Sequence, residues 1–91
     1  MKSGTLKNGF AYHYDEQNAD DMTFIETLAV VMDDEENEVT RLAASGKVLG
    51  LLLGKKQKAE LYRHIAKGHG GRVPLAVMND VLGEIMGAEK N

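Results

Sequence analysis

The amino-acid sequence predicts a mainly α-helical domain that begins with a short β-hairpin and continues with about four compact helices. Three observations support this fold class: an Asn-Gly pair separates two β-prone runs, apolar residues then recur three and four positions apart, and glycine or proline interrupts that pattern. At 91 residues the chain has the size of one domain. We therefore expect a single domain over 1–91, with the hairpin at about 4–14, the helices at about 18–87 and a polar tail at 88–91.

The hairpin is predicted from Asn8 and Gly9, a strong signal for a two-residue type I′ turn. Alternation along the second strand places the aromatic residues Phe10, Tyr12 and Tyr14 on one face. A two-stranded hairpin is marginal alone, so this face needs a helix or another chain to cover it. Phe10, Tyr12 and Tyr14, with the unpaired edge of the hairpin, are therefore candidates for self-association, and we expect a homo-oligomer.

A first helix is predicted from Asn18 to about Asp33, with Asn18 or Asp20 as its N-cap. Acidic residues are unfavourable at a helix C-terminus, so the run 33–36 indicates a solvated turn that ends the helix. This run lacks the alternating ligands and the glycine of a calcium loop. The expected inward stripe comprises Met22, Ile25, Leu28, Ala29 and Met32.

A second helix is expected from about Asn37 or Glu38 to Leu53, with Gly54 as the terminating residue. Each glycine inside a helix costs about 1 kcal/mol relative to alanine, so Gly46 and Gly50 indicate close packing against another helix. The expected inward stripe comprises Val39, Leu42, Ala43, Gly46, Leu49, Gly50 and Leu53.

A third helix is predicted at about 55–67 and a fourth after Pro74, with the glycine-rich segment 68–71 between them and Gly87 as the stop. The third helix is expected to turn Ala59, Tyr62, Ile65 and Ala66 inward, and the fourth Leu75, Met78, Val81, Leu82, Ile85 and Met86. Met22, Met32, Met78 and Met86 thus fall on or near expected inner faces, where methionine fills irregular gaps.

Charge is distributed unevenly along the chain. Residues 1–46 contain ten acids and three bases, a balance of −7, whereas residues 47–91 contain eight bases and four acids, a balance of +4. The chain has no cysteine, which excludes disulfides, thiolate metal sites and a cysteine nucleophile. The chain has neither a signal-peptide pattern nor an apolar run of the roughly 18 residues that a membrane span needs, so we expect a cytoplasmic protein that does not bind membranes.

The residues that could perform chemistry do not form a recognisable site. His13, His64 and His69 fall on a strand, a helix and a loop without the spacing of a metal motif. The segment 68–72 matches neither phosphate-binding glycine motif, and Pro74 removes an N–H donor from the next helix. Neither serine lies in a nucleophile elbow. We therefore predict no enzymatic activity, no cofactor and no metal.

A basic stretch on the third helix supports an alternative function. Lys55, Lys56, Lys58 and Arg63 could contact phosphates, and two helices joined by a glycine-containing turn loosely resemble a helix-turn-helix. A small DNA-binding regulator is therefore an alternative hypothesis. Acids at Asp80 and Glu84 on the fourth helix would repel DNA, which makes nucleic acid the less favoured partner.

Several landmarks together resemble a known family. In order, these are Gly9-Phe10-Ala11-Tyr12, Asp20-Asp21-Met22 opening a helix that ends at Leu28-Ala29, Leu52-Leu53-Gly54-Lys55-Lys56-Gln57, Leu61-Tyr62 and Gly71-Arg72-Val73-Pro74. Over about 5–87 the sequence resembles the tail assembly chaperones of long-tailed (siphovirus-type) phages and prophages. The glycine-rich segment 68–71 departs from the more acidic turn expected of them.

The resemblance implies a helical protein of the bacterial host cytoplasm that binds the long tape-measure protein during tail assembly. It also implies self-association and absence from the finished virion, and some members of the family are made in a longer frameshifted form. No catalytic or binding residue follows from it. A binding protein of this kind needs adaptable apolar surface and no catalytic site. This agrees with the prediction, made above from the residues, that the protein has no enzymatic activity.

Overall fold

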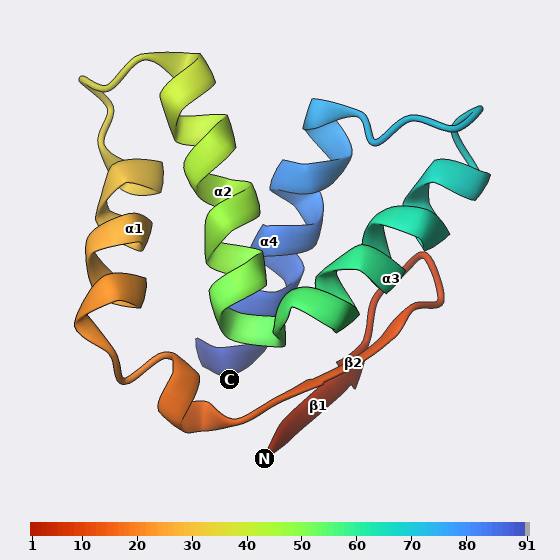
Figure 1. Cartoon of the computed structure of the whole chain (residues 1–91), viewed down its shortest axis with the longest axis horizontal. Coiled ribbons are helices and arrows are strands. Elements are labelled where there is room, and N and C mark those ends of the chain that lie inside the picture. Colours follow the sequence, from red (N-terminus) through yellow and green to blue (C-terminus); the bar gives the residue numbers. More distant parts are fainter. Residues whose placement is uncertain (91) are drawn as a thin grey trace.

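Four α-helices and an N-terminal hairpin form the structure, a computed structural model that describes residues 1–90, apart from the side chains of 88–90 (Figure 1). This architecture confirms the predicted fold class. The elements are β1 (Lys2–Thr5), β2 (Ala11–Tyr14), a 3-10 turn (Glu16–Asn18), α1 (Met22–Met32), α2 (Glu38–Leu53), α3 (Lys55–Lys67) and α4 (Leu75–Lys90).

Helix α2 is the centre of the molecule, because it packs against α1, α3, α4 and β2. Figure 1 shows α1 beside α2, α4 behind it, and the hairpin beneath α3. Val48 and Leu52 are buried although they lie outside the expected stripe, whereas Val39 and Ala43 are exposed. One inward stripe was therefore too narrow a prediction for α2, since three helices and a strand cover different sides of it.

A single apolar core joins the hairpin to the helices. The radius of gyration is 12.7 Å, close to the roughly 12 Å expected of a compact domain of this length. The buried cluster comprises Leu6, Tyr12, Tyr14, Phe24, Val48, Leu49, Leu52, Leu53, Leu61, Ile65, Met78, Val81, Leu82 and Ile85.

The turn of the hairpin differs from the predicted type I′ turn. The Leu6 amide donates to the Phe10 carbonyl, and the Gly9 amide donates to the Leu6 carbonyl, both at 2.9 Å, so the loop has three residues. A type I′ turn needs positive φ at both central residues, but of Asn8 and Gly9 only Gly9 has it, at 92°. The Asn8 side chain instead accepts a hydrogen bond from the Phe10 amide at 2.9 Å, which stabilises a type I turn closed by glycine.

The aromatic face of the hairpin is covered by the chain's own helices. Tyr12 and Tyr14 are buried in the core and stack with their ring centroids 6.3 Å apart, while Phe10 is half-buried. Gly4 lies opposite Tyr12 in the sheet, and a Cβ there would come within 2.8 Å of two atoms of the Tyr12 ring and hydroxyl. The expectation that Tyr12 and Tyr14 are exposed for self-association is therefore corrected: both are core residues.

Polar contacts fasten the hairpin to α3 and α4. The Gln57 side chain accepts from the His13 amide at 2.9 Å and donates to the His13 carbonyl at 2.7 Å. His64 Nε2 lies 2.8 Å from the Asn8 carbonyl, to which it can only donate, and the Lys7 amide donates to Glu84 at 2.9 Å. These long-range bonds explain how so short a hairpin holds its place.

Helix α1 begins later than predicted and turns a different face inward. Asp21 is the N-cap, accepting from the Thr23 amide at 2.7 Å, while the Asn18 side chain donates to the Leu52 carbonyl at 2.8 Å and so does not cap the helix. Phe24 is buried, and Leu28 and Val31 pack against the core beside it. Of the expected inward stripe, Leu28 alone takes part; Met22, Ile25, Ala29 and Met32 are exposed.

The two helix glycines mark a close approach, as predicted. A Cβ at Gly46 would lie 2.8 Å from the Tyr62 hydroxyl, and one at Gly50 would lie 3.3 Å from Cδ of Lys58, so α3 packs directly on the α2 backbone. The Lys58 ammonium lies 5.3 Å from the centroid of the Tyr62 ring. Burial raises the pKa of the Tyr62 hydroxyl above its ordinary value.

The boundaries of α2 and α3 agree with the prediction, whereas the end of α4 does not. Gly54, with φ of 88°, ends α2 as expected. Gly87 was expected to stop α4, yet the helix continues to Lys90. Gly87 does not have the positive φ of a terminating glycine, and one glycine weakens a helix without breaking it. Residues 88–90 of the predicted tail are therefore helical, and residue 91 lies outside the described part.

Candidate interaction surface

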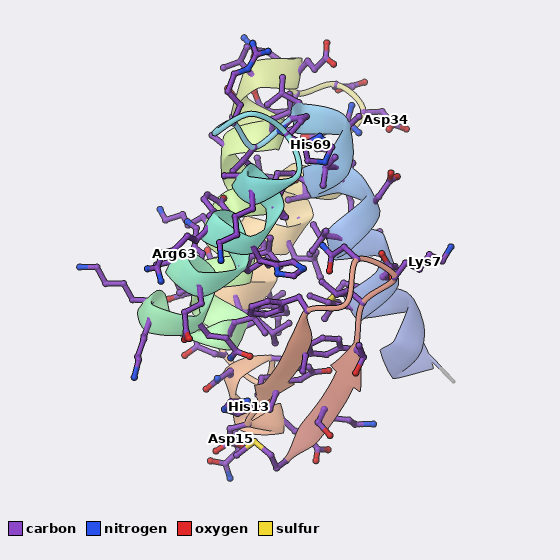
Figure 2. The ribbon with its side chains drawn as sticks, turned by 90° about the vertical axis from the view of Figure 1, so that its right-hand side faces the viewer. Lys7, His13, Asp15, Asp34, Arg63 and His69 are labelled. Atoms are coloured by element: carbon purple, nitrogen blue, oxygen red, sulfur yellow. The ribbon has the colours of Figure 1, made fainter. Side chains whose placement is uncertain are left out.

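The three histidines lie at separate places in the structure. Figure 2 shows His13 on the hairpin and His69 at the opposite end of the molecule. His64, which bonds to the hairpin loop, also packs its ring 5.7 Å from that of Phe10. Among the side chains that the structure describes, no group of three or more histidines or acids could hold a metal ion.

The acidic turn and the glycine-rich loop are both bonded internally. Asp33 accepts from the Glu35 amide at 3.0 Å, and Asn37 caps α2 by accepting from the Thr40 amide at 3.0 Å. Four amides of the segment 68–72 donate to carbonyls of α3 or of the loop itself, at 2.9 to 3.3 Å. These amides are therefore directed at the protein backbone and not at a bound anion, which favours the interpretation of a helix connection.

The basic residues of α3 do not share one face. Lys55, Lys56 and Arg63 are exposed, and Figure 2 shows Arg63 pointing away from the body of the molecule. Lys58 is half-buried instead, because it lies along α2 and over Tyr62. The proposed basic contact face thus loses one of its four members. DNA binding stays a prediction, which salt-dependent gel shifts with substitutions at Lys55, Lys56 and Arg63 would test.

An exposed apolar stripe runs along α1. Met22 is 65% exposed and Met32 70%, while Ile25 and Ala29 between them are also exposed. These four residues are spaced by three, four and three positions, so they lie along one side of the helix. Large apolar side chains are mostly buried in small domains, and a contiguous exposed row of them marks a binding surface.

The same side of α1 borders a groove between α1 and α4, referred to below as the α1–α4 groove. Leu28, Val31 and Met32 line it from α1, and Asn79, Leu82, Gly83 and Met86 line it from α4. A second hollow shares Val31 and Asn79 with the first and reaches Glu38, Arg41, Leu42 and Ser45 of α2. The two hollows, about 360 and 190 Å³ in volume, therefore adjoin and are together called the trough, with α2 lining the second hollow.

Another apolar hollow lies at the N-terminal ends of α2 and α4. Val39, 75% exposed, and Leu75, 61% exposed, line it together. Tyr62 and Met78 form part of its wall. Sequence periodicity placed both Val39 and Leu75 in the core, but each lies in the first turn of its helix and is largely exposed at the edge of this hollow.

Acidic residues lie at one end of the trough that contains the α1–α4 groove. The segment 20–38, which comprises α1 and its flanks, contains eight acids and no base, and one of these acids, Glu38, lines the second hollow. Glu26 instead lines a separate hollow between α1 and α2, and Glu84 of α4 accepts from the Lys7 amide of the hairpin. Arg41 is the base that lines the trough. Its Nε donates to the Val31 carbonyl at 3.2 Å and its guanidinium lies 3.9 Å from Asp34. The groove is therefore apolar inside, and acids lie at the end of the trough where α1 leads into α2.

Comparisons with protein-family models, with curated proteins and with solved structures gave no match to this chain. Across residues 1–90, none of the helices combines the length and the apolarity needed to cross a membrane.

Proposed function

We propose that this protein is a tail assembly chaperone of a long-tailed phage or prophage, which binds the tape-measure protein during tail assembly in the bacterial cytoplasm. The observation that carries the proposal is the row of exposed apolar side chains on α1, next to an apolar groove. The order of landmarks in the sequence, which resembles that family, supplies the identity of the partner.

The physical basis of this function is transient cover for apolar helix surface. A long helical protein exposes apolar faces before it assembles, and these faces aggregate unless another apolar surface covers them. Met22, Met32 and Met86 offer flexible, polarisable side chains that adapt to different sequences. A chaperone of this kind needs adaptable contact area and no reaction chemistry.

Co-expression with the tape-measure protein of the same genome tests the proposal. We expect the tape-measure protein to be more soluble in the presence of this chain and to co-purify with it. The matched control is a double substitution, Lys56→Ala with Arg63→Ala, which alters exposed residues of α3 away from the apolar surface and should leave capture unchanged. If the wild-type chain neither solubilises nor retains the tape-measure protein, the proposed function is wrong.

A further inference from the structure

We infer that the α1–α4 groove binds an amphipathic helix of the partner protein whose apolar stripe is flanked by lysine or arginine. This inference rests on the proposed function and deepens it, because it names the surface and the chemical character of the bound segment. It depends on three features of the groove: its apolar lining, its lack of backbone hydrogen-bonding partners and the charge around it.

The groove and the stripe on α1 form one apolar surface. Met32 belongs to both, and Ile25 lies two helical turns before it on the same side of α1. Across the groove, Leu82 and Met86 supply the opposite wall, while Gly83 leaves room between them. An aliphatic stripe that enters between the two walls would bury apolar area on both sides, which is the main source of affinity in such a contact.

The bound segment must satisfy its own backbone, because both walls of the groove are helices. The amide and carbonyl groups of α1 and α4 are bonded along each helix, so an extended peptide in the groove would find no ladder partners. A helix bonds its own amides and carbonyls internally and presents side chains alone. Helix-in-groove binding is therefore the mode that this surface fits.

The charged residues beside the groove determine which residues can flank the apolar stripe of the bound helix. Glu38 lines the trough, Asp34 lies beside it, and Arg41, the base in its lining, is already engaged with Asp34 and the Val31 carbonyl. A helix with acidic flanks would be repelled here, whereas lysine or arginine beside the apolar stripe would be attracted. This complementarity speeds association and discriminates between partners more than it adds affinity.

A second copy of this chain does not present such a helix. The bases of the chain are concentrated on α3, but the apolar residues Leu61 and Ile65 of α3 are buried in its own core. The exposed surface of α3 therefore combines positive charge with little apolar area. The occupant that we infer is therefore a helix of a different protein.

Two synthetic helical peptides with the same leucine stripe, one flanked by lysine and one by glutamate, test the inference with the wild-type chain. We expect the lysine peptide to bind at least about tenfold more tightly at low salt in a fluorescence anisotropy titration, with the difference shrinking as salt screens the charges. Equal binding of the two peptides would overturn the charge argument.

Substitution of Gly83 tests the place of binding. A Cβ at Gly83 would meet no atom within 4 Å, so Gly83→Arg can fold normally while its long cationic side chain fills the groove. We expect Gly83→Arg to weaken binding of the lysine peptide by about tenfold or more, and Gly83→Ala, the matched control, to change it by less than about twofold. Equal binding by the two variants would overturn the assignment of the groove.

The same variants separate this inference from the proposed function. If Gly83→Arg still captures the tape-measure protein as well as Gly83→Ala does, the groove is not the binding site, although the chaperone function stands. If the wild-type chain captures none, the function fails whatever the peptides do. If light scattering instead shows self-association that Gly83→Arg abolishes, the occupant is a second copy and the inference is wrong.

Discussion

Gly46 and Tyr62 show how a single hydroxyl group sets the distance between α2 and α3. A Cβ at Gly46 would lie 2.8 Å from the Tyr62 hydroxyl, and the other atom that it would meet within 4 Å is Nζ of Lys58, at an ordinary 3.8 Å. Removal of the hydroxyl therefore removes the clash. The helix-forming advantage of alanine over glycine, about 1 kcal/mol, should then become visible.

We predict that Gly46→Ala lowers the free energy of unfolding by about 1 kcal/mol in the wild-type chain, because the overpacking cost exceeds the gain in helix propensity. In the Tyr62→Phe background the same substitution should raise it by about 1 kcal/mol. Urea denaturation of the four proteins in this double-mutant cycle measures the coupling. Equal effects of Gly46→Ala in both backgrounds would contradict the contact.

The sequence predicted the need for close packing at Gly46 and Gly50 but not the partner residues. A glycine inside a helix is costly, so its presence on an apolar stripe indicates that a neighbour comes near. That the neighbours are Tyr62 and the stem of Lys58 depends on the angle between α2 and α3, which Gly54 sets with its φ of 88°. A lysine stem lying over a helix surface is not visible in a pattern of polar and apolar letters.

At the scale of the element, the sequence pattern of α1 explains why the exposed apolar stripe was not predicted from the sequence. Two apolar stripes share this helix: Met22, Ile25, Ala29 and Met32 on one side, and Phe24, Leu28 and Val31 on another. Both follow helical spacing, so periodicity alone cannot decide which one is buried. The structure buries the stripe with the aromatic ring, which offers more apolar area, and leaves the methionine stripe exposed.

A single side chain of α3, that of Gln57, anchors the hairpin to the helices, and this contact leads to a prediction for the hairpin as an element. Gln57 makes two hydrogen bonds with the His13 backbone, and its amide also donates to the Leu53 carbonyl at 2.9 Å. We predict that Gln57→Ala lowers the free energy of unfolding by about 1–2 kcal/mol, given about 0.5–1.5 kcal/mol net for each partly solvated bond.

Hydrogen exchange locates this effect. In Gln57→Ala the His13 amide should lose its protection, whereas amides in the middle of α2 should keep theirs, because the hairpin opens locally before the helices unfold. Lys56→Ala is the control, since Lys56 is exposed, and its stability should change by less than about 0.5 kcal/mol. Unchanged exchange at His13 in Gln57→Ala would show that the hairpin is held by its buried aromatic residues alone.

At the scale of the whole molecule, the charge imbalance along the sequence becomes a separation in space. The acids of the segment 20–38 lie around α1, and the bases of the segment 55–72 lie on and after α3, on the other side of α2 (Figure 1). The sign of each half was predictable from composition. The groove was not, because it depends on which side of α1 faces α4 and on how far apart those two helices stand.

Self-association stays a prediction. Because Tyr12 and Tyr14 are buried, we now expect the edge of β1, and not the aromatic face of the hairpin, to mediate it. Leu6 and Phe10 form a hydrogen-bonded pair, so alternation turns the backbone groups of Ser3 and Thr5 away from β2. Gln57 covers the corresponding groups of His13 on the other edge. Among the described residues, none bonds to the outward amides of Ser3 and Thr5.

Two copies of this edge can pair antiparallel, with Ser3 of each copy opposite Thr5 of the other. That register forms four hydrogen bonds and sets Lys2 opposite Leu6, which avoids repulsion between the two lysines. At about 1 kcal/mol for each bond, the dissociation constant is on the order of 1 mM, so the dimer should form at high concentration.

The substitution Ser3→Pro tests this pairing, because proline removes the outward amide without breaking a bond inside the hairpin. Light scattering from about 10 µM to about 1 mM should show a rising mass for the wild-type chain and for Ser3→Ala, which keeps the amide, but a constant monomer mass for Ser3→Pro. A wild-type chain that stays monomeric over this range would exclude edge pairing, and a Ser3→Pro variant that still dimerises would place the interface elsewhere.

Since the β1 edge and the α1–α4 groove use different residues, Ser3→Pro should leave capture of the lysine peptide unchanged. Self-association and partner binding are then separable properties of this chain.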